Sequence, residues 1–332
     1  MPNISYLPLM SFEPFLKAIT LQVSQIEYGQ QPAELYDPIR YIMSLGGKRL
    51  RPLLTVLAAN LFTDNWQKSL KAAAAVEVFH NFSLMHDDIM DKAPLRRGQP
   101  TVHQKWNNNI AILSGDVMLV NAYELLLDVP TDQLARVIGR FNKTAAEVCE
   151  GQQLDMNFET RWDVTEAEYL NMIRLKTSVL LGFALELGGI VAGADTTTTQ
   201  QLYEAGVNMG LGFQLKDDLL DVYGNPDKFG KQVGGDIISN KKTFLLIEAL
   251  ERATGSDRTE LDGWLAATDF DTDQKVRAVT ALFSKLEIDK LTEIKINQYF
   301  ATGFETIKQL PITQNRKQPL IDFIDFLMVR ES

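Results

Sequence analysis

Two short runs of aspartate are the part of this sequence best suited to chemistry. Residues 87–91 read Asp-Asp-Ile-Met-Asp, and residues 217–221 read Asp-Asp-Leu-Leu-Asp. On a helix, residues four apart project from the same face one turn apart, and like charges at that spacing destabilise the helix. Each run follows an apolar stretch, at 82–85 and at 211–215, so the surrounding helix is expected to be buried. A bound cation would remove this conflict.

The acidic runs predict a site for a hard metal ion. Oxygen ligands alone favour Mg²⁺ or Mn²⁺, and Mg²⁺ in proteins is typically held by one or two carboxylates, with waters and substrate phosphates. A phosphorylated ligand is therefore expected with the metal. A solvated helix end would explain a single run better, but the same spacing twice argues against it. The predicted ligands are Asp87, Asp88, Asp91, Asp217, Asp218 and Asp221.

Basic residues gather near the first run. Residues 46–52 read Gly-Gly-Lys-Arg-Leu-Arg-Pro, and Arg96-Arg97-Gly98 follows the run in a proline-bounded loop. The arginine fork suits paired phosphate oxygens, and lysine supplies a compact charge. The formal net charge of -10 argues against a general affinity for nucleic acid. These basic clusters therefore predict local binding of a diphosphate, although alone they would pass for solubilising surface residues.

The elements that must position these groups are predicted to be helices. Apolar residues recur every three or four positions through residues 68–90, as on a buried helix face. Sustained alternation of the strand type is nearly absent, and no linker or short repeat divides the chain. The sequence predicts an all-α protein with a single domain, residues 1–332. Further helices are predicted at about 10–28, 32–45, 50–63, 103–128, 131–157, 166–193, 197–222, 240–254, 273–299 and 316–330.

Cysteine content and hydropathy limit where the chain works. Cys149 is the only cysteine, which excludes an internal disulfide and a thiolate metal site. It also weakly favours a reducing, cytoplasmic setting. The N-terminal residues do not form a signal peptide, and no window approaches a membrane span. No transmembrane segment is expected.

In order along the chain, these motifs resemble those of the trans-prenyl diphosphate synthases, the farnesyl and geranylgeranyl diphosphate synthase group. No single motif is specific, but the combination is. The resemblance implies a large helical bundle of the isoprenoid synthase type with a central active-site cavity. The matching elements are Gly47-Lys48-Arg49-Leu50-Arg51-Pro52, His80, the first aspartate run, Arg96-Arg97-Gly98, Lys176-Thr177, Gly212-Phe213-Gln214, the second run, Lys231 and Lys241.

The resemblance also implies a reaction. Three Mg²⁺ ions would bind both runs and clamp the diphosphate of an allylic substrate (dimethylallyl, geranyl or farnesyl), with Asp87, Asp91 and Asp217 as principal ligands and Mn²⁺ as a substitute. Ionisation would give an allylic cation, which isopentenyl diphosphate attacks before a proton is lost. Fixed positive charge around the leaving group would supply most of the rate.

The family implies a role for each basic or polar site residue. Thr177 and Gln214 would stabilise the cation, and the departing diphosphate would take the proton. The predicted ligands of the allylic diphosphate are Arg96, Lys176, Lys231 and Lys241. Those of isopentenyl diphosphate are Lys48, Arg51, His80 and Arg97. Without the neighbouring motifs, His80 would be interpreted as a core histidine whose hydrogen bonds are made within the protein.

Three features fit the family less closely. Gln152 and Asp155 resemble a family segment that faces the site, although structural helix residues would look the same. Asn240 stands where the family usually has glycine before the lysine, so the chain departs from the family pattern directly before Lys241. The C-terminus lacks the strongly basic ending of some members, which argues against a lid role for the tail.

Product length is predicted from the helix that carries the first run. The product should extend toward the N-terminus of that helix, where Ser83 and Phe82 precede Asp87 by about 6 and 7.5 Å. Phe82 would act as a floor, with Phe79 one turn deeper as a second floor, unless Phe82 is merely core. The pattern resembles geranylgeranyl diphosphate synthases and favours a C20 product, with C15 (farnesyl diphosphate) as the alternative.

Two other functions remain open at this point. A class I terpene cyclase would share the fold and one aspartate run, but its second metal motif is typically of an Asn/Ser/Glu type. A non-catalytic subunit of a heteromeric synthase would be a binding protein and would usually lack some of these aspartates. Family members are usually homodimers, so a homodimer is expected.

Overall fold

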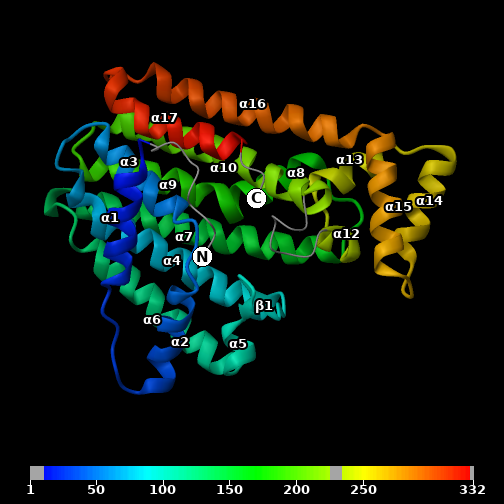
Figure 1. Ribbon diagram of the computed structural model, residues 1–332, viewed down its shortest axis with the longest axis horizontal. Coiled ribbons are helices and arrows are strands. Elements are labelled where there is room, and N and C mark those ends of the chain that lie inside the picture. The colour runs from blue at the N-terminus through cyan, green and yellow to red at the C-terminus, as the bar shows by residue number, and fades with distance from the viewer. Residues whose placement is uncertain (1–10, 225–233, 330–332) are drawn as a thin grey trace. The chain divides into compact units, whose positions relative to one another are not determined.

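The computed structural model describes residues 11–224 and 234–329, and within these ranges the chain is almost entirely helical (Figure 1). The only strands there are β1 (Leu95–Arg96) and β2 (Gln99–Pro100), an antiparallel pair with Leu95 opposite Pro100. The predicted all-α class is confirmed.

Most helices lie where periodicity predicts them. In the first half of the chain they are α1 (Glu13–Ser24), α2 (Ala33–Ser44), α3 (Leu50–Asn60), the 3₁₀ turn η1 (Trp66–Ser69), α4 (Leu70–Met90), α5 (Val102–Lys105), α6 (Asn108–Leu126) and α7 (Thr131–Glu159). In the second half they are α8 (Glu166–Ile173), the π turn η2 (Arg174–Ser178), α9 (Val179–Val191), α10 (Thr196–Tyr223), α12 (Gly235–Ile238), α13 (Phe244–Arg252), α14 (Gly255–Ala266), α15 (Thr272–Lys285), α16 (Ile288–Gln309) and α17 (Gln314–Val329).

Three helical predictions need correction. The helix expected at 103–128 is two helices, α5 and α6, because the chain leaves helical geometry at Trp106 and Asn107. The helix expected at 273–299 is two helices, α15 and α16, because the chain turns at Glu287, which has a left-handed φ of 56°. The helix α14 was not predicted, since its sequence holds two glycines and few apolar residues. Its buried residues are Leu261 and Leu265, so packing rather than amphipathic pattern sustains it.

The described chain forms two compact units. Unit 1 comprises residues 1–144, 180–206 and 306–326, and unit 2 comprises residues 145–179, 207–305 and 327–332. The aspartate run at 87–91 belongs to unit 1, and the run at 217–221 belongs to unit 2. The single domain expected from the sequence stays a prediction.

Unit 1 is built around α4. The alanines and valine at 72–76 are almost completely buried, and small side chains of this kind let neighbouring helices approach closely. One turn further along, Phe79 packs edge to face on Phe141, with ring centroids 5.1 Å apart. Phe141 also meets Phe183 at 5.7 Å. These aromatic contacts fix α4 against α7 and α9.

Unit 2 has its own core between α13, α14 and α15. Figure 1 shows α14 and α15 running side by side. The buried members of this core are Val222, Ile237, Leu245, Leu246, Ala249, Ala253, Leu261, Leu265, Val279, Leu282, Phe283 and Ile288. The short helix α12 packs against α15, which brings the segment before Lys241 onto this core.

The helix α6 has an unusual surface in unit 1. It packs on α2 and α4, yet Ile112, Leu113 and Val120 are 43–57% exposed. By length and mean hydropathy (1.2) it is the one described helix that could cross a bilayer, with 33% of that window buried. A single helix of this kind is weak evidence for a membrane span.

Candidate active site

The first aspartate run ends α4 in unit 1. Asp87 is half-buried, Asp88 is buried and Asp91 is exposed at the helix C-cap. Arg96 reaches back from β1 and donates to both carboxylate oxygens of Asp88, with Nε at 2.8 and 2.9 Å and Nη2 at 2.6 Å. A buried carboxylate is costly without such a partner. Arg96 therefore holds the hairpin against the run, besides its predicted role on the allylic diphosphate.

A second group in unit 1 joins three residues predicted to bind isopentenyl diphosphate. Arg51 Nη1 lies 3.1 Å from His80 Nε2. Because arginine can only donate, His80 Nε2 accepts and the ring is neutral. Burial and the nearby arginines, Arg51 and Arg97 foremost, hold the pKa of His80 well below its usual value. Arg97 donates to the carbonyl oxygen of Gly46.

Backbone geometry explains the glycines beside these arginines. Gly47 has a φ of +147°, and a Cβ there would lie 3.0 Å from Arg97 Nη2. The loop thus lets the Arg97 guanidinium lie directly on the backbone before Lys48, which is exposed. Within unit 1 the structure thus brings Arg51 to His80 and Arg97 to the loop before Lys48, and the binding of isopentenyl diphosphate by these four residues stays a prediction.

A buried ion pair that the sequence did not predict lies next to this group. Arg49 forms an ion pair with Glu77, whose side chain is 3% exposed. Asn81 donates to the Glu77 carboxylate at 3.0 Å. Arg49 adopts a left-handed φ of 50°, so this pair fixes the strained residue between Lys48 and Arg51. A glutamate on the otherwise apolar face of α4, three residues before His80, was the signal available.

The second aspartate run lies on α10 in unit 2. Asp218 is 5% exposed and accepts hydrogen bonds from the Tyr169 hydroxyl and from Gln214 Nε2, the latter at 3.0 Å. Burial, followed by the charge of Asp236, raises the pKa of Asp218 to about 7. Asp221 Oδ2 accepts the backbone N–H of Asp236 at 3.0 Å. Tyr169 and Asp236 were not predicted as site residues.

Four predicted catalytic residues meet in unit 2 around a small cavity of about 40 Å³. Thr177 Oγ1 donates to Gln214 Oε1 at 3.0 Å. Lys176 Nζ lies 2.6 Å from Asp155 Oδ2, and Lys241 Nζ lies 4.0 Å from the same oxygen. Burial raises the pKa of Asp155, but Lys241 and Lys176 together lower it below its usual value. Lys231 lies outside the described residues.

A π turn aims Lys176 and Thr177. Residues 174–178 widen the helix between α8 and α9, and Ser178 Oγ donates to the Ile173 carbonyl at 3.2 Å. Two glycines, Gly151 and Gly210, pack closely against the turn. A Cβ on Gly151 would lie 2.2 Å from the Lys176 backbone nitrogen, and one on Gly210 would lie 2.6 Å from Ser178 Cα. Such turns are frequent at functional sites.

The predicted chain-length residues lie together on α4. Phe79 is buried, Phe82 and Ser83 are half-buried, and the two rings are 5.6 Å apart. Phe82 also meets the His86 ring edge to face at 4.8 Å, and the Ser83 hydroxyl donates to the His80 carbonyl at 2.9 Å. Phe79 is therefore committed to the core, and Phe82 is the ring closer to the run.

The donor sets suit a hard cation that also binds a ligand. Among the described residues, no group of three or more His, Cys, Asp or Glu side chains forms a closed metal centre. Asp88 and Asp218 are held by protein donors, so each run has the composition expected where one or two carboxylates share a metal with waters and phosphates. The residues present fit Mg²⁺ or Mn²⁺ in that mode.

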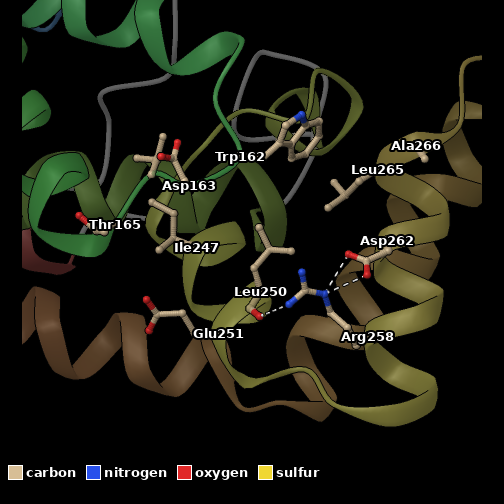
Figure 2. Close-up of a pocket in the computed structure, with 11 residues that line it drawn as sticks. Trp162, Asp163, Thr165, Ile247, Leu250, Glu251, Arg258, Asp262, Leu265 and Ala266 are labelled. Atoms are coloured by element: carbon tan, nitrogen blue, oxygen red, sulfur yellow. Dashed lines mark hydrogen bonds and ion pairs between the residues drawn. The ribbon is translucent and has the colours of Figure 1, made fainter.

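A larger groove of about 560 Å³ opens elsewhere in unit 2. Figure 2 shows Trp162 over one end, Ile247 and Leu250 along the floor, and Arg258 paired with Asp262 on α14. None of the described site residues lines it. The predicted residues Lys176, Thr177, Gln214, Asp218 and Lys241 line the smaller cavity instead.

Comparison with known proteins places the chain in a family. Residues 32–283 match the family model of the polyprenyl synthetases. A geranylgeranyl diphosphate synthase of Methanosarcina mazei is 39% identical over 303 residues, 91% of each chain. A geranylfarnesyl diphosphate synthase of Natronomonas pharaonis is 36% identical over 91% of each chain.

Solved structures agree with these sequence matches. A crystal structure of a geranylgeranyl pyrophosphate synthase is 47% identical, covers 96% of this chain and 97% of its own, and gives a TM-score of 0.89. A geranylgeranyl pyrophosphate synthetase from Pyrococcus horikoshii is 31% identical with the same coverage and TM-score. The chain belongs to the polyprenyl synthetase family. It is a prenyl diphosphate synthase, as the order of its motifs indicates.

Proposed function

We propose that this protein condenses isopentenyl diphosphate with an allylic diphosphate and releases geranylgeranyl diphosphate. The observation that carries the proposal is the 39% identity, over nine-tenths of both chains, to a relative named geranylgeranyl diphosphate synthase. The terpene cyclase and the non-catalytic subunit are disfavoured, because both aspartate runs and the Gly46–Pro52 loop are present in full.

In unit 1, the side chains of Lys48, Arg51, His80 and Arg97 bind isopentenyl diphosphate without a metal. Lys48, Arg51 and Arg97 supply charge, and the Arg97 fork is pre-placed by the Gly46 carbonyl. His80 is neutral in the unliganded protein and can donate from Nδ1. Positioned cations of this kind orient the nucleophilic double bond and reduce the entropy lost in the encounter.

In unit 2, Thr177 and Gln214 offer oxygen dipoles to the developing allylic cation. The Gln214 side chain is fixed at both ends, since its oxygen accepts from Thr177 and its nitrogen donates to Asp218. Lys176, Lys231 and Lys241 meet the negative charge that grows on the departing diphosphate. Fixed dipoles and charges need little reorganisation as the bond breaks.

In unit 1 Asp87 and Asp91, and in unit 2 Asp217, would be the main ligands of Mg²⁺, for which the family resemblance implies three ions and Mn²⁺ as a substitute. When bound, the metal would supply Lewis-acid chemistry to the leaving diphosphate. Asp88, Asp218 and Asp221 contribute less, because protein groups already bind their carboxylates. Arg96 pairs with Asp88, Tyr169 and Gln214 donate to Asp218, and the Asp236 amide donates to Asp221.

The oligomeric state and the cellular location are also part of the proposal. The protein works as a homodimer in the cytoplasm, and the exposed apolar side chains of α6, Ile112, Leu113 and Val120, pack against the second copy. Burial of that surface explains why a helix with a mean hydropathy of 1.2 is only one-third buried within one chain.

Product analysis tests the function. The purified chain is incubated with Mg²⁺, isopentenyl diphosphate and each allylic primer, and the dephosphorylated alcohols are separated by chain length. A main C20 product supports the proposal. Main products of C15 or C25 would change the assignment within the family, the latter in line with the relative named geranylfarnesyl diphosphate synthase. Cyclic hydrocarbon or no turnover at all would refute it.

A further inference from the structure

Lys275 on α15 is a lysine in an unusual place. Its side chain is completely buried, whereas lysine is almost never fully buried unless paired. Its Nζ donates to Asn240 Oδ1 at 2.7 Å and to the Ile238 carbonyl at 3.4 Å, and it lies 4.2 Å from the centre of the Phe270 ring. No carboxylate of the described residues pairs with it, and burial lowers its pKa. The buried Lys275 ammonium is therefore stabilised by its hydrogen bonds to the turn that contains Ile238 and Asn240.

The turn in question carries a strained residue. Asn240 has a left-handed φ of 53°, a conformation that glycine adopts without cost and that asparagine tolerates better than other residues. Besides accepting from Lys275, the Asn240 side chain donates from Nδ2 to the Leu265 carbonyl at 3.1 Å. Leu265 lies near the end of α14, on the wall of the groove in Figure 2. The Asn240 side chain is therefore hydrogen-bonded to residues of both α14 and α15.

The next residue is the site residue Lys241. Its backbone N–H donates to the Asp236 carbonyl at 2.9 Å, and its side chain lines the small cavity with Asp155 and Asp218. Asp236 is itself bound through its own N–H to Asp221 of the second run. The segment 236–241 is thus attached at one end to the aspartate run and at the other to Lys275.

We propose that Lys275 and Asn240 are positioning residues for Lys241. Lys275 holds the asparagine side chain, the side chain holds the left-handed turn, and the turn sets where the Lys241 ammonium meets the allylic diphosphate. In this chain the pair does what a glycine at position 240 would do by conformational freedom alone. The inference depends on the proposed function only for the ligand that Lys241 binds.

Four variants test the proposal: Lys275→Met, Asn240→Gly, the double variant and, as a control on the same helix, Lys285→Met. The Lys285 side chain is 62% exposed and pairs only with Asp257 among the described residues. The two KM values and kcat are measured with Mg²⁺ well below the melting temperature of every variant. We expect Lys275→Met to lower kcat/KM for the allylic primer roughly ten- to a hundredfold, with KM for isopentenyl diphosphate within about twofold.

The double variant separates positioning from general stability. If Lys275 acts through the strained asparagine, Asn240→Gly removes the need for it, so the double variant regains most of the lost kcat/KM. A merely structural lysine would leave the double variant as impaired as Lys275→Met. That result, or wild-type kinetics for Lys275→Met, overturns the inference.

A second comparison covers the case in which Lys275→Met does not fold. Asn240→Ala removes the acceptor and keeps the left-handed strain, whereas Asn240→Gly removes both. We expect the alanine variant to lose kcat/KM for the allylic primer as Lys275→Met would, and the glycine variant to stay within about threefold of wild type. Equal kinetics for the two refute the proposal. An inactive wild-type chain would instead refute the proposed function.

Discussion

The middle aspartates of the two runs, Asp88 and Asp218, are both buried although they lie 130 positions apart. Each is buried and held by protein donors, Arg96 in one case and Tyr169 with Gln214 in the other. Their neighbours Asp87 and Asp217 are half-buried. At the level of single residues, each run therefore holds a buried carboxylate bound by protein donors beside a less buried one to which the proposed function assigns the metal.

This division predicts the effect of removing the first aspartate of either run. Asp87→Ala and Asp217→Ala should each lower kcat by about 10²-fold or more, because charge stabilisation of the leaving group is lost. The melting temperature should change less than in Asp88→Ala or Asp218→Ala, because Asp88 and Asp218 are the more deeply buried carboxylates. Steady-state kinetics and circular dichroism check this, with exposed Asp269→Ala as control. Turnover near wild type in either variant would remove the metal role.

His80 predicts a pH dependence of stability. Its pKa is depressed in the folded protein, so the unfolded chain takes up a proton near pH 6.5 while the folded chain does not. Stability contributed by neutral His80 is present above pH 6.5 and is lost as the pH falls below it, by up to about 1.4 kcal/mol per pH unit.

Thermal melts of the metal-free protein at pH 7.5 and 5.5 measure this effect. Wild type should lose more stability on acidification than His80→Asn, which keeps a polar side chain but cannot titrate. His103→Asn serves as the matched control, because His103 lies on α5, outside the group formed by Arg51, His80 and Arg97. Parallel losses in wild type and His80→Asn would contradict the assignment.

Among the elements, the π turn before α9 depends on the glycines packed against it. Gly151→Ala would place a methyl group 2.2 Å from the Lys176 backbone, and overpacking of this kind costs about 1–3 kcal/mol. We expect a lower melting temperature and a lower kcat, because Lys176 and Thr177 must move.

The same helix supplies the control. Gly139 also lies on α7, but a Cβ there would meet nothing within 4 Å. Gly139→Ala should raise stability by about 0.5–1 kcal/mol, with unchanged kinetics. Chemical denaturation of both variants gives the comparison, and destabilisation of equal size would show that the turn does not need Gly151.

The helix α4 carries the proposed ruler for product length. Phe82→Ala should lengthen the main product, because the half-buried ring nearest the run is removed. Phe79→Ala should instead destabilise the protein by about 3–5 kcal/mol, since that ring packs on both Phe82 and Phe141. Chromatography of the products decides the point. A product distribution unchanged in Phe82→Ala would leave Phe82 as core alone.

Periodicity predicted most of the helices, for physical reasons. Residue chemistry named side chains that the structure brings together within each unit, such as Thr177 with Gln214 and Arg51 with His80, and their roles stay predictions. Buried faces repeat every three or four residues, and aspartates one turn apart on an apolar helix need a cation. The π turn, α14 and the break at Glu287 arise from tertiary packing and backbone strain, which leave little periodic signal. Arg49–Glu77 and Lys275–Asn240 escaped detection because each partner lies far from the other in sequence.

For the whole molecule, the exposed apolar side chains of α6 predict the state of assembly. Leu113→Glu combined with Val120→Glu should convert the expected dimer to a monomer, because two charges would have to be buried in the contact. Light scattering after size exclusion measures the mass. Lys105→Glu, on the neighbouring α5, controls for the change in charge. A wild-type mass for the double variant would place the contact elsewhere.

Trp162 gives the protein an internal optical probe. The ammonium group of Lys242 lies 4.1 Å above its indole ring, and Lys242 directly follows Lys241. A positive charge so near an indole shifts its emission, so the fluorescence of Trp162 should change whenever the backbone beside Lys241 moves. The chain has only four tryptophans. Replacing the other three with phenylalanine would leave one emitter, whose spectrum could follow substrate arrival in stopped-flow time.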